Sequence, residues 1–195
     1  MKVEITKSGS LVNMINGTEI RGRLATDVLS EWELFQKYVA KGNSYIETGV
    51  LFGGSLIVAG LLCDGPLHGI DPLYGFYGKG REDRATQLVP SYEIVMENVS
   101  RFPEINPQRV IIHQQKSYPW PEALEGMTFD TGFIDGDHTY KGCLRDWENM
   151  RECVTKHIIV DNIDHAAIGR LRKIFDGEWD FVREAGRMGV WRKPK

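Results

Sequence analysis

The sequence lacks several features that mark whole classes of protein. Its three cysteines, Cys63, Cys143 and Cys153, form no C-x-x-C pair and no zinc-binding spacing, and an odd number argues against a disulfide framework. No apolar run approaches the length of a membrane span, and the N-terminus has no signal-peptide pattern. These absences predict a reduced, cytoplasmic protein with no membrane segment.

An excess of charge of either sign is also missing. The formal net charge is −3 over 195 residues, and no basic stretch indicates a surface for nucleic acid. The longest basic cluster, 187–195, alternates charged with apolar residues, which is typical of a solvated edge strand. There is no internal repeat, and the length suits one domain with a substantial core. We therefore expect a single main domain with no nucleic-acid partner.

Strands and helices are predicted to alternate along most of the chain, beginning with a helix for which Asp27 is a good N-cap. Such alternation predicts a mainly parallel sheet with helices on both faces and right-handed crossovers. The predicted strands are 45–48, 67–70, 109–113, 128–134, 157–160, 179–183 and 189–192. The predicted helices are 28–39, 54–62, 84–102, 119–124, 140–154 and 164–175.

Two segments have no clear place in this alternation. Residues 1–26 contain a short alternating run and an Asn16-Gly17 turn signal, which suits a small hairpin or an arm over the site or over a neighbouring subunit. We therefore divide the chain into a 1–26 arm or hairpin and a 27–195 domain, and expect a homodimer. Residues 72–84 form a long loop rich in glycine, proline and aromatic residues, either functional or a surface loop.

The centre of the sequence is a glycine-rich turn between strand 45–48 and helix 54–62, which reads E-T-G-V-L-F-G-G-S. Glycine permits backbone angles that a Cβ disfavours and lets a ligand approach the main chain, while free N–H groups at the helix start face the crevice. About twenty residues later, strand 67–70 ends in Asp71, where doubly wound folds bind ribose hydroxyls. Alternatively, Asp71 only forms a turn before Pro72.

Polar side chains follow two further predicted strands, 128–134 and 157–160. Asp135 comes directly after the first strand, and Asp161 and Asn162 follow the second. Ligands of open α/β sheets bind beyond the carboxyl ends of the strands, so we expect these side chains to form an all-oxygen cluster. Such a cluster suits a hard divalent ion such as Mg²⁺, Ca²⁺ or Mn²⁺. The alternative is that Asp137 and Asp161 cap the helices that follow them.

These motifs resemble those of the class I S-adenosylmethionine-dependent methyltransferases. The turn matches their first motif, E/D-x-G-x-x-x-G, and F-I-D-G-D-H-T-Y at 133–140 resembles the signature of a small, methyltransferase 24-like branch. The D-N step at 161–162 is similar to that of metal-dependent O-methyltransferases of the catechol and caffeoyl-CoA type. The resemblance covers about 45–162 and implies a Rossmann-like three-layer α/β sandwich. Its seven-stranded sheet would be mainly parallel, with an antiparallel C-terminal strand.

The resemblance also implies roles for the matched residues. Asp135, Asp161 and Asn162 would hold a divalent cation such as Mg²⁺, which binds the acceptor's oxygens and lowers the pKa of its hydroxyl. His138 stands where the catechol enzymes have a lysine base, and a histidine suits proton removal near neutral pH, although it could instead orient the acceptor or pack. The cofactor would be bound by Glu47, Thr48, Gly49, Gly53, Gly54, Ser55, Asp71, Ser117 and Asp135.

Parts of the comparison are weaker. Gln115 replaces a glycine of the catechol enzymes, so only Ser117 carries over from that stretch, and it could equally be a turn hydroxyl. Arg145 and Asp146 are interpreted as charges on a helix face, and His113 as a core histidine. The candidates for lining an acceptor pocket are Lys79, Arg81, Arg84, Trp120 and His165.

We predict a methyltransferase that uses S-adenosylmethionine to methylate a hydroxyl of a small molecule, with His138 and Asp135 as catalytic residues. An alternative is a binding module or regulatory subunit that holds the cofactor without transfer chemistry. A nicotinamide oxidoreductase is disfavoured because the glycine spacing differs from the dinucleotide pattern. A metal-dependent hydroxylase is disfavoured because the sequence has no iron-binding triad.

Overall fold

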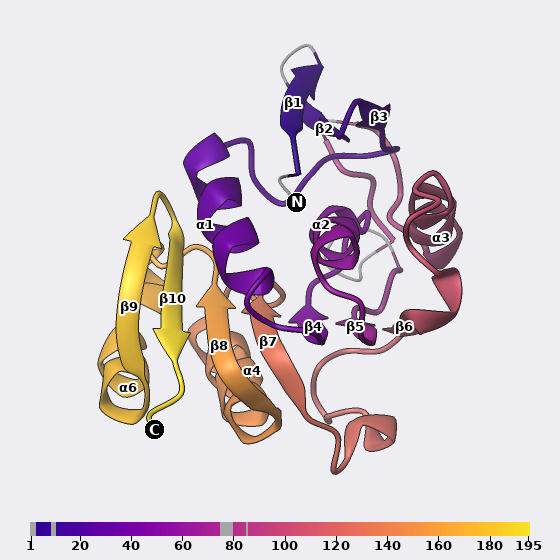
Figure 1. Cartoon of the computed structure of the whole chain (residues 1–195). Helices are drawn as coiled ribbons and strands as arrows, with labels where there is room; N and C mark the ends of the chain where they lie inside the picture. Colours follow the sequence, from indigo (N-terminus) through magenta and orange to yellow (C-terminus); the bar gives the residue numbers. More distant parts are fainter. Residues whose placement is uncertain (1–2, 9–10, 75–79, 85) are drawn as a thin grey trace.

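A seven-stranded sheet forms the centre of the molecule (Figure 1). The computed structural model describes residues 3–8, 11–74, 80–84 and 86–195. The strand order is β6-β5-β4-β7-β8-β10-β9, and β10 alone runs in the opposite direction to the other six strands. This confirms the predicted Rossmann-like fold with an antiparallel C-terminal strand. The strands are β4 Tyr45–Thr48, β5 Leu67–Ile70, β6 Val110–His113, β7 Phe129–Ile134, β8 Val154–Val160, β9 Asp180–Ala185 and β10 Met188–Arg192.

Helices cover both faces of this sheet. In Figure 1, α1 and α2 lie in front of the strands, and α4 and α6 lie behind them. Within the described ranges, every helix is too short or too polar to cross a lipid bilayer. The helices are α1 Leu29–Val39, α2 Gly54–Leu62, α3 Tyr92–Ser100, α4 Tyr140–Cys153, α5 Ala166–Gly169 and α6 Arg172–Glu178, with 3₁₀ turns at Pro107–Arg109 and Glu122–Leu124.

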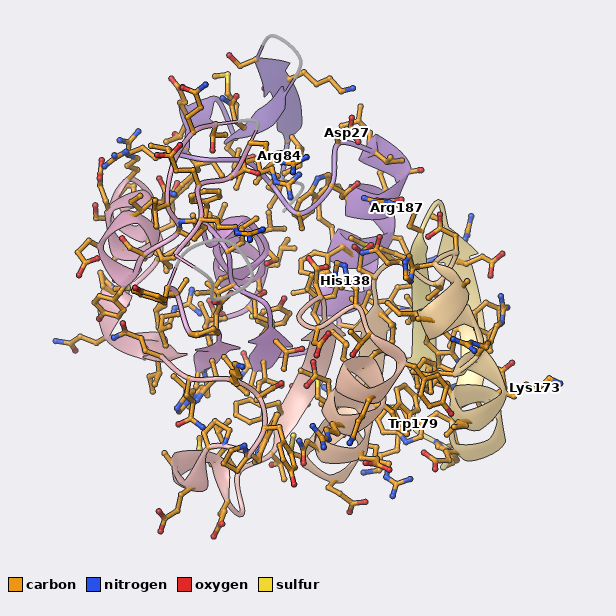
Figure 2. The ribbon with its side chains drawn as sticks, turned by 180° about the vertical axis from the view of Figure 1, so that it is seen from behind. Asp27, Arg84, His138, Lys173, Trp179 and Arg187 are labelled. Atoms are coloured by element: carbon orange, nitrogen blue, oxygen red, sulfur yellow. The ribbon has the colours of Figure 1, made fainter. Side chains whose placement is uncertain are left out.

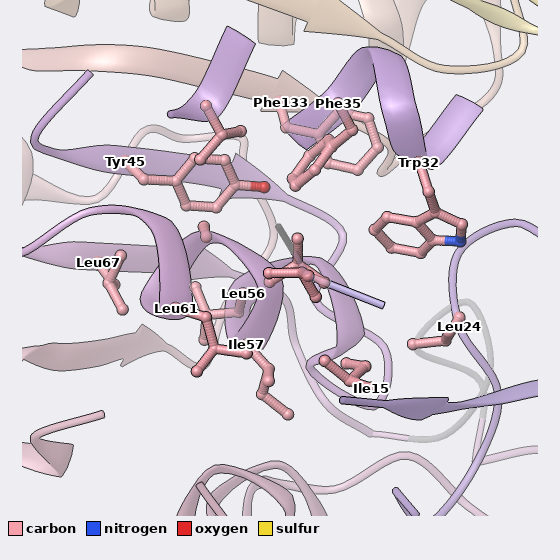
Figure 3. Packing of buried hydrophobic residues seen from close by; sticks show 14 of the residues in the cluster. Ile15, Leu24, Trp32, Phe35, Tyr45, Leu56, Ile57, Leu61, Leu67 and Phe133 are labelled. Atoms are coloured by element: carbon pink, nitrogen blue, oxygen red, sulfur yellow. The ribbon is translucent and has the colours of Figure 1, made fainter. Parts of the chain in front are cut away.

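The sheet divides the hydrophobic core into two layers, because successive side chains of a strand point to opposite faces. Tyr45 and Phe133 belong to the layer under α1 and α2, whereas Ile46 and Ile134 belong to the layer under α4 and α6. Figure 3 shows the first layer, in which the ring of Phe35 packs edge-on at 5.9 Å from Tyr45 and 5.1 Å from Phe133. Burial of both faces explains why β4 is apolar except for its site residues.

Several predicted helices differ from the structure, including 119–124, which forms only the 3₁₀ turn Glu122–Leu124. Asp27 is not an N-cap: α1 starts after Val28, whose N–H is held by the Thr26 hydroxyl. The predicted 84–102 helix begins only at Tyr92, because Pro90 favours extended backbone before it and Ser91 caps the helix. The predicted 164–175 helix is divided into α5 and α6.

The C-terminal strand is not the edge strand that its sequence suggested. β10 lies between β8 and β9, and Val190 and Trp191 are fully buried. The Trp191 ring packs 5.2 Å from Phe175, and its Nε1 donates to Asp176 Oδ1 at 2.8 Å. Burial of these side chains therefore decides the position of β10, and the exposed β9 forms the edge.

The N-terminal residues pack against the main sheet's helices. β1 Ile5–Ser8, β2 Leu11–Ile15 and β3 Thr18–Glu19 form a separate antiparallel sheet. The following segment crosses the start of α2, where Leu24 fills the space that a side chain at Gly54 would occupy, with Leu24 Cδ2 2.4 Å from a Cβ built there. The segment therefore covers the glycine turn.

Asn98 of α3 is predicted to be a main anchor of this segment. Its buried amide accepts from Arg21 N at 2.7 Å and donates to Arg21 O at 2.8 Å and Phe52 O at 2.9 Å. Asn98→Ala leaves these buried groups unpaired and should lower the free energy of unfolding by about 2–4 kcal/mol, measured by urea denaturation. The matched control is the exposed Gln108→Ala, and an equal, small effect of both changes would contradict the assignment.

Candidate active site

The glycine turn after β4 is shaped by close contact with the end of β7. Gly49 has φ +87°, and a Cβ at this position would lie 2.2 Å from the carbonyl oxygen of Asp135. Gly53 has φ +82° and is the N-cap of α2. Both positions require glycine, because L-residues with a side chain disfavour this conformation. The turn is therefore built against the first residue of the polar segment that follows β7.

Asp71 braces this turn from the end of β5. Its Oδ2 accepts from the backbone N–H of Val50 at 2.9 Å and Leu51 at 3.1 Å, and its Oδ1 accepts from Leu73 N at 2.8 Å. Leu51 is held at φ +53°, a strained angle for a residue with a side chain. Burial raises the pKa of Asp71, and these three N–H groups oppose the rise. Asp71 therefore does more than form a turn before Pro72, since it holds the glycine turn in shape.

Glu47 lies beneath the turn and is fully buried. Tyr45 Oη donates to its Oε2 at 2.6 Å. Burial raises the pKa of Glu47 to about 8, and the nearby hydroxyls of Ser55 and Tyr45 oppose that rise. Burial therefore favours the protonated form of this carboxyl at neutral pH.

Asp135, His138 and Asp161 come together at the carboxyl ends of β7 and β8. One ligand atom from each lies within 4.8 Å of the other two, and His138 Nε2 is 3.2 Å from Asp135 Oδ1. Asp161 is buried, and its Oδ1 has no hydrogen-bond partner among the described residues. Burial, and then the nearby charge of Asp135, raise the pKa of Asp161 to about 9. The N-cap of the following helix, α5, is His165, so Asp161 does not cap it.

Asn162 adjoins this cluster through its amide nitrogen. Its Nδ2 donates to Asp161 Oδ2, and its Oδ1 accepts from Arg187 Nη1 at 3.2 Å. The expected ligand oxygen thus faces Arg187, whereas His138 joins the two carboxylates. Arg187 comes from the turn between β9 and β10, whereas the sequence places it only in the basic C-terminal cluster. The local sequence around Arg187 carries no signal of this role.

Asp137 and the start of α4 complete the loop after β7. Asp137 Oδ1 accepts from Thr139 N at 3.0 Å, and Thr139 is the N-cap, accepting from Gly142 N at 3.0 Å. A Cβ at Gly142 would lie 2.2 Å from the Asp137 carboxyl carbon, so the loop closes tightly over this glycine. Asp137 therefore shapes the turn before the helix and lies outside the acidic cluster.

Asp146 was wrongly interpreted as a charge on an exposed helix face. It is fully buried, and its Oδ2 lies 3.2 Å from a Cβ built on Gly136. Burial raises the pKa of Asp146 to about 6, while the nearby hydroxyls of Ser117 and Thr48 lower it. Neither of its oxygens has a hydrogen-bond partner among the described residues, and it lies beside Thr48, a residue assigned to the cofactor. The helical spacing of the sequence does indicate this burial, because it places Asp146 on the same apolar face of α4 as Cys143 and Met150.

The remaining candidates are spread over several places. His113 was interpreted as a core histidine but is only partly buried, and its Nε2 lies 3.1 Å from Nδ1 of the buried His68. His165 lines a hollow of about 700 Å³ together with Tyr140 and Arg170, in segments that follow His138 and Asn162. Trp120 lines another hollow of about 260 Å³ at the far end of α4. Arg81 and Arg84 are exposed, and Lys79 lies outside the described residues.

The comparisons with known proteins agree with this geometry. The sequence model of a family described as "Methyltransferase domain" (Methyltransf_24) matches residues 46–163, from β4 to the residue after Asn162. The chain belongs to this family. It is a class I S-adenosylmethionine-dependent methyltransferase of the F-I-D-G-D-H branch, as its motifs indicated. Among curated proteins, no significant match is found.

Solved structures share the fold at low sequence identity. The O-methyltransferase NovP has a TM-score of 0.63 and 19% identity, over 86% of this chain and 81% of NovP. An O-methyltransferase from Bacillus cereus, in complex with SAH, has a TM-score of 0.61 and 16% identity, over 87% of this chain and 83% of that protein. The O-methyltransferase TomG from Streptomyces achromogenes, in complex with SAM, has a TM-score of 0.57 and 13% identity, over 87% of this chain and 82% of TomG. At such identities the likeness supports the fold.

The buried Glu47 predicts a stability difference that depends on pH. Its folded pKa of about 8 lies above the ordinary 4.5, so its contribution to stability is complete below pH 4.5 and is lost as the pH rises toward 8. Glu47→Gln keeps an oxygen for Tyr45 and has no charge to bury. As the pH rises from 5 to 8, the free energy of unfolding of the variant should therefore increase relative to that of the wild type by a few kcal/mol, as an order of magnitude.

Urea denaturation at both pH values measures this gain. The exposed Glu33→Gln is the matched control, with the same chemical change on α1. A difference between Glu47→Gln and wild type that does not change with pH would contradict the assignment.

Proposed function

We propose that this protein transfers the methyl group of S-adenosylmethionine to a hydroxyl oxygen of a small molecule. The observation that carries the proposal is the contact between the glycine turn and the polar end of β7, which puts a cofactor motif beside the Asp135, His138 and Asp161 cluster. The named O-methyltransferases among the similar structures support the choice of oxygen as the methyl acceptor.

The cofactor would lie across the glycine turn. Asp71 Oδ1 accepts a single backbone N–H and keeps a free lone pair, so the carboxylate can also receive a ribose hydroxyl. Ser117, Thr48 and the buried Asp146 would form the adenine side of the site. Transfer then forms a C–O bond as the C–S bond breaks, with S-adenosylhomocysteine as the leaving group. The chain's main task is to align the two reactants.

His138 is suited to remove the proton of the acceptor hydroxyl. Its side chain is about one-third exposed, whereas that of Asp135 is 14% exposed, so the imidazole can meet a substrate while the carboxylate holds it. The hydrogen bond to Asp135 raises the pKa of His138 and stabilises the imidazolium that forms. Asp135 thereby orients the base, in addition to its place in the acidic cluster.

The cluster also fits a divalent cation. The buried Asp161 Oδ1 has no partner among the described residues, and two neighbouring carboxylates repel each other without a positive charge. Asp135 and Asp161 would hold Mg²⁺ or Mn²⁺, and the ion would supply Lewis acidity that lowers the pKa of the acceptor hydroxyl. His138 then stays free to take the proton. The hollow beside Tyr140 and His165 is a candidate for the rest of the acceptor.

Calorimetric titration tests the cofactor assignment. Asp71→Ala removes the brace of the turn and the ribose acceptor, so it should weaken S-adenosylmethionine binding by about 10–100-fold. Asp137→Asn, which keeps its oxygen for the turn before α4, is the control and should bind like the wild type. A folded wild-type protein that binds no S-adenosylmethionine would overturn the proposed function.

Formation of S-adenosylhomocysteine over a panel of catechol-like and sugar acceptors tests the chemistry. Once a substrate is found, His138→Gln should lower kcat by about 10²–10⁴-fold and leave cofactor affinity unchanged, because it removes only the base. Asp135→Asn should remove both turnover and the response of the titration to Mg²⁺. Cofactor binding without turnover on any acceptor would favour the alternative of a binding module.

The expected cytoplasmic location, homodimer and lack of a nucleic-acid partner stay predictions. Size-exclusion chromatography with light scattering measures the oligomeric state directly.

A further inference from the structure

A buried carboxylate on α1 holds the turn between β9 and β10. Glu31 is fully buried, and its Oε1 accepts from the backbone N–H of Arg187 at 2.7 Å, with Arg187 Nε at 3.6 Å. Its Oε2 accepts from the Thr26 hydroxyl. Gly186 has φ +55°, and a Cβ there would lie 2.2 Å from Glu31 Oε1. The turn is therefore fixed tightly against α1.

Arg187 extends from this anchor to the end of β8. Its carbonyl oxygen accepts from Ile163 N at 2.9 Å, and its Nη1 donates to Asn162 Oδ1 at 3.2 Å. Figure 2 shows Arg187 beside α1, at the same end of the molecule as His138 and away from Trp179. Backbone and side chain of Arg187 thus hold the segment that carries Asn162.

Asn162 is fixed at both ends of its amide. Its Oδ1 faces the guanidinium of Arg187, and its Nδ2 faces the carboxylate of Asp161. A guanidinium needs an acceptor and a carboxylate needs a donor, so the opposite orientation of the amide would lose both bonds. The backbone of Asn162, at φ +57°, holds the side chain in this place. The amide oxygen therefore cannot join the acidic cluster while Arg187 keeps its bond.

We propose that Arg187 is a positioning residue that withholds the Asn162 oxygen from the cation site and places a fixed positive charge beside Asp161. A divalent ion is then bound by Asp135 and Asp161 without Asn162, and more weakly than the same cluster would bind it without Arg187. The inference rests on the cation assigned under the proposed function and defines its ligands. It departs from the ligand set that the catechol-type resemblance implied.

Mn²⁺ titration, followed by calorimetry and by the electron paramagnetic resonance of free Mn²⁺, tests this without any turnover. Arg187→Met should bind Mn²⁺ at least about 10-fold more tightly than the wild type, because it removes a nearby positive charge and frees the amide oxygen. Adding Asn162→Ala to Arg187→Met should cancel part of this gain. Arg183→Met, an exposed arginine on β9, makes the same change in net charge and should have no effect.

Arg187→Met removes the guanidinium beside the buried Glu31 carboxylate, which could prevent folding. If the single variant does not fold, the double variant Glu31→Gln with Arg187→Met is used in its place, because it removes the buried charge as well. Wild-type binding that is not tightened by loss of Arg187 would overturn the inference and leave the cation site standing. Binding only after loss of Arg187 would support the inference and remove the cation from the wild-type mechanism. No binding by any variant would overturn both cation assignments. S-adenosylmethionine binding by the same samples tests the methyltransferase proposal separately.

Discussion

The structure depends on one close approach, that of the glycine turn after β4 to the first residues after β7. No side chain fits between Gly49 and the Asp135 carbonyl, so the two loops share one surface. Their strands are neighbours in the sheet, and Asp135 N also donates to Thr48 O at 3.0 Å. In the proposed function, a cofactor on the turn would thereby lie next to the cluster that would activate an acceptor. The fold would then fix the two reactants relative to each other through this contact.

The site's second constraint is its concentration of buried acid. Glu47, Asp71, Asp146 and Asp161 all have raised pKa values because they are removed from water. Their surroundings differ. Glu47 accepts a hydrogen bond from the Tyr45 hydroxyl, and Asp71 accepts hydrogen bonds from backbone N–H groups. Asp161 faces another carboxylate, with Arg187 nearby. Asp161 has a buried Oδ1 without a partner among the described residues and forms one cluster with Asp135 and His138, which is why the proposed cation is placed there.

Arg187 connects this site to parts of the chain far from it in sequence. Glu31 lies before β4, the first strand of the main sheet, and Arg187 lies directly before β10, the last strand of the chain. Even so, the Glu31 carboxylate accepts a hydrogen bond from the backbone N–H of Arg187. Several contacts hold the N-terminal segment to the domain, among them the hydrogen bonds of Thr26 with Glu31 and of Arg21 with Asn98. The periphery of the fold therefore sets the electrostatics at its centre.

The sequence by itself determined the elements whose signals are local. Apolar runs ending in polar residues predicted every strand of the main sheet, and glycine spacing with F-I-D-G-D-H predicted the family and the meeting of Asp135 with Asp161. Tertiary structure alone decided what depends on distant partners. Burial of Trp191 against Phe175 placed β10 inside the sheet, burial turned Asp146 inward, and the Glu31 anchor brought Arg187 to Asn162. Local patterns encode periodicity and turn geometry, whereas burial and charge pairing arise only when segments from different parts of the chain pack together.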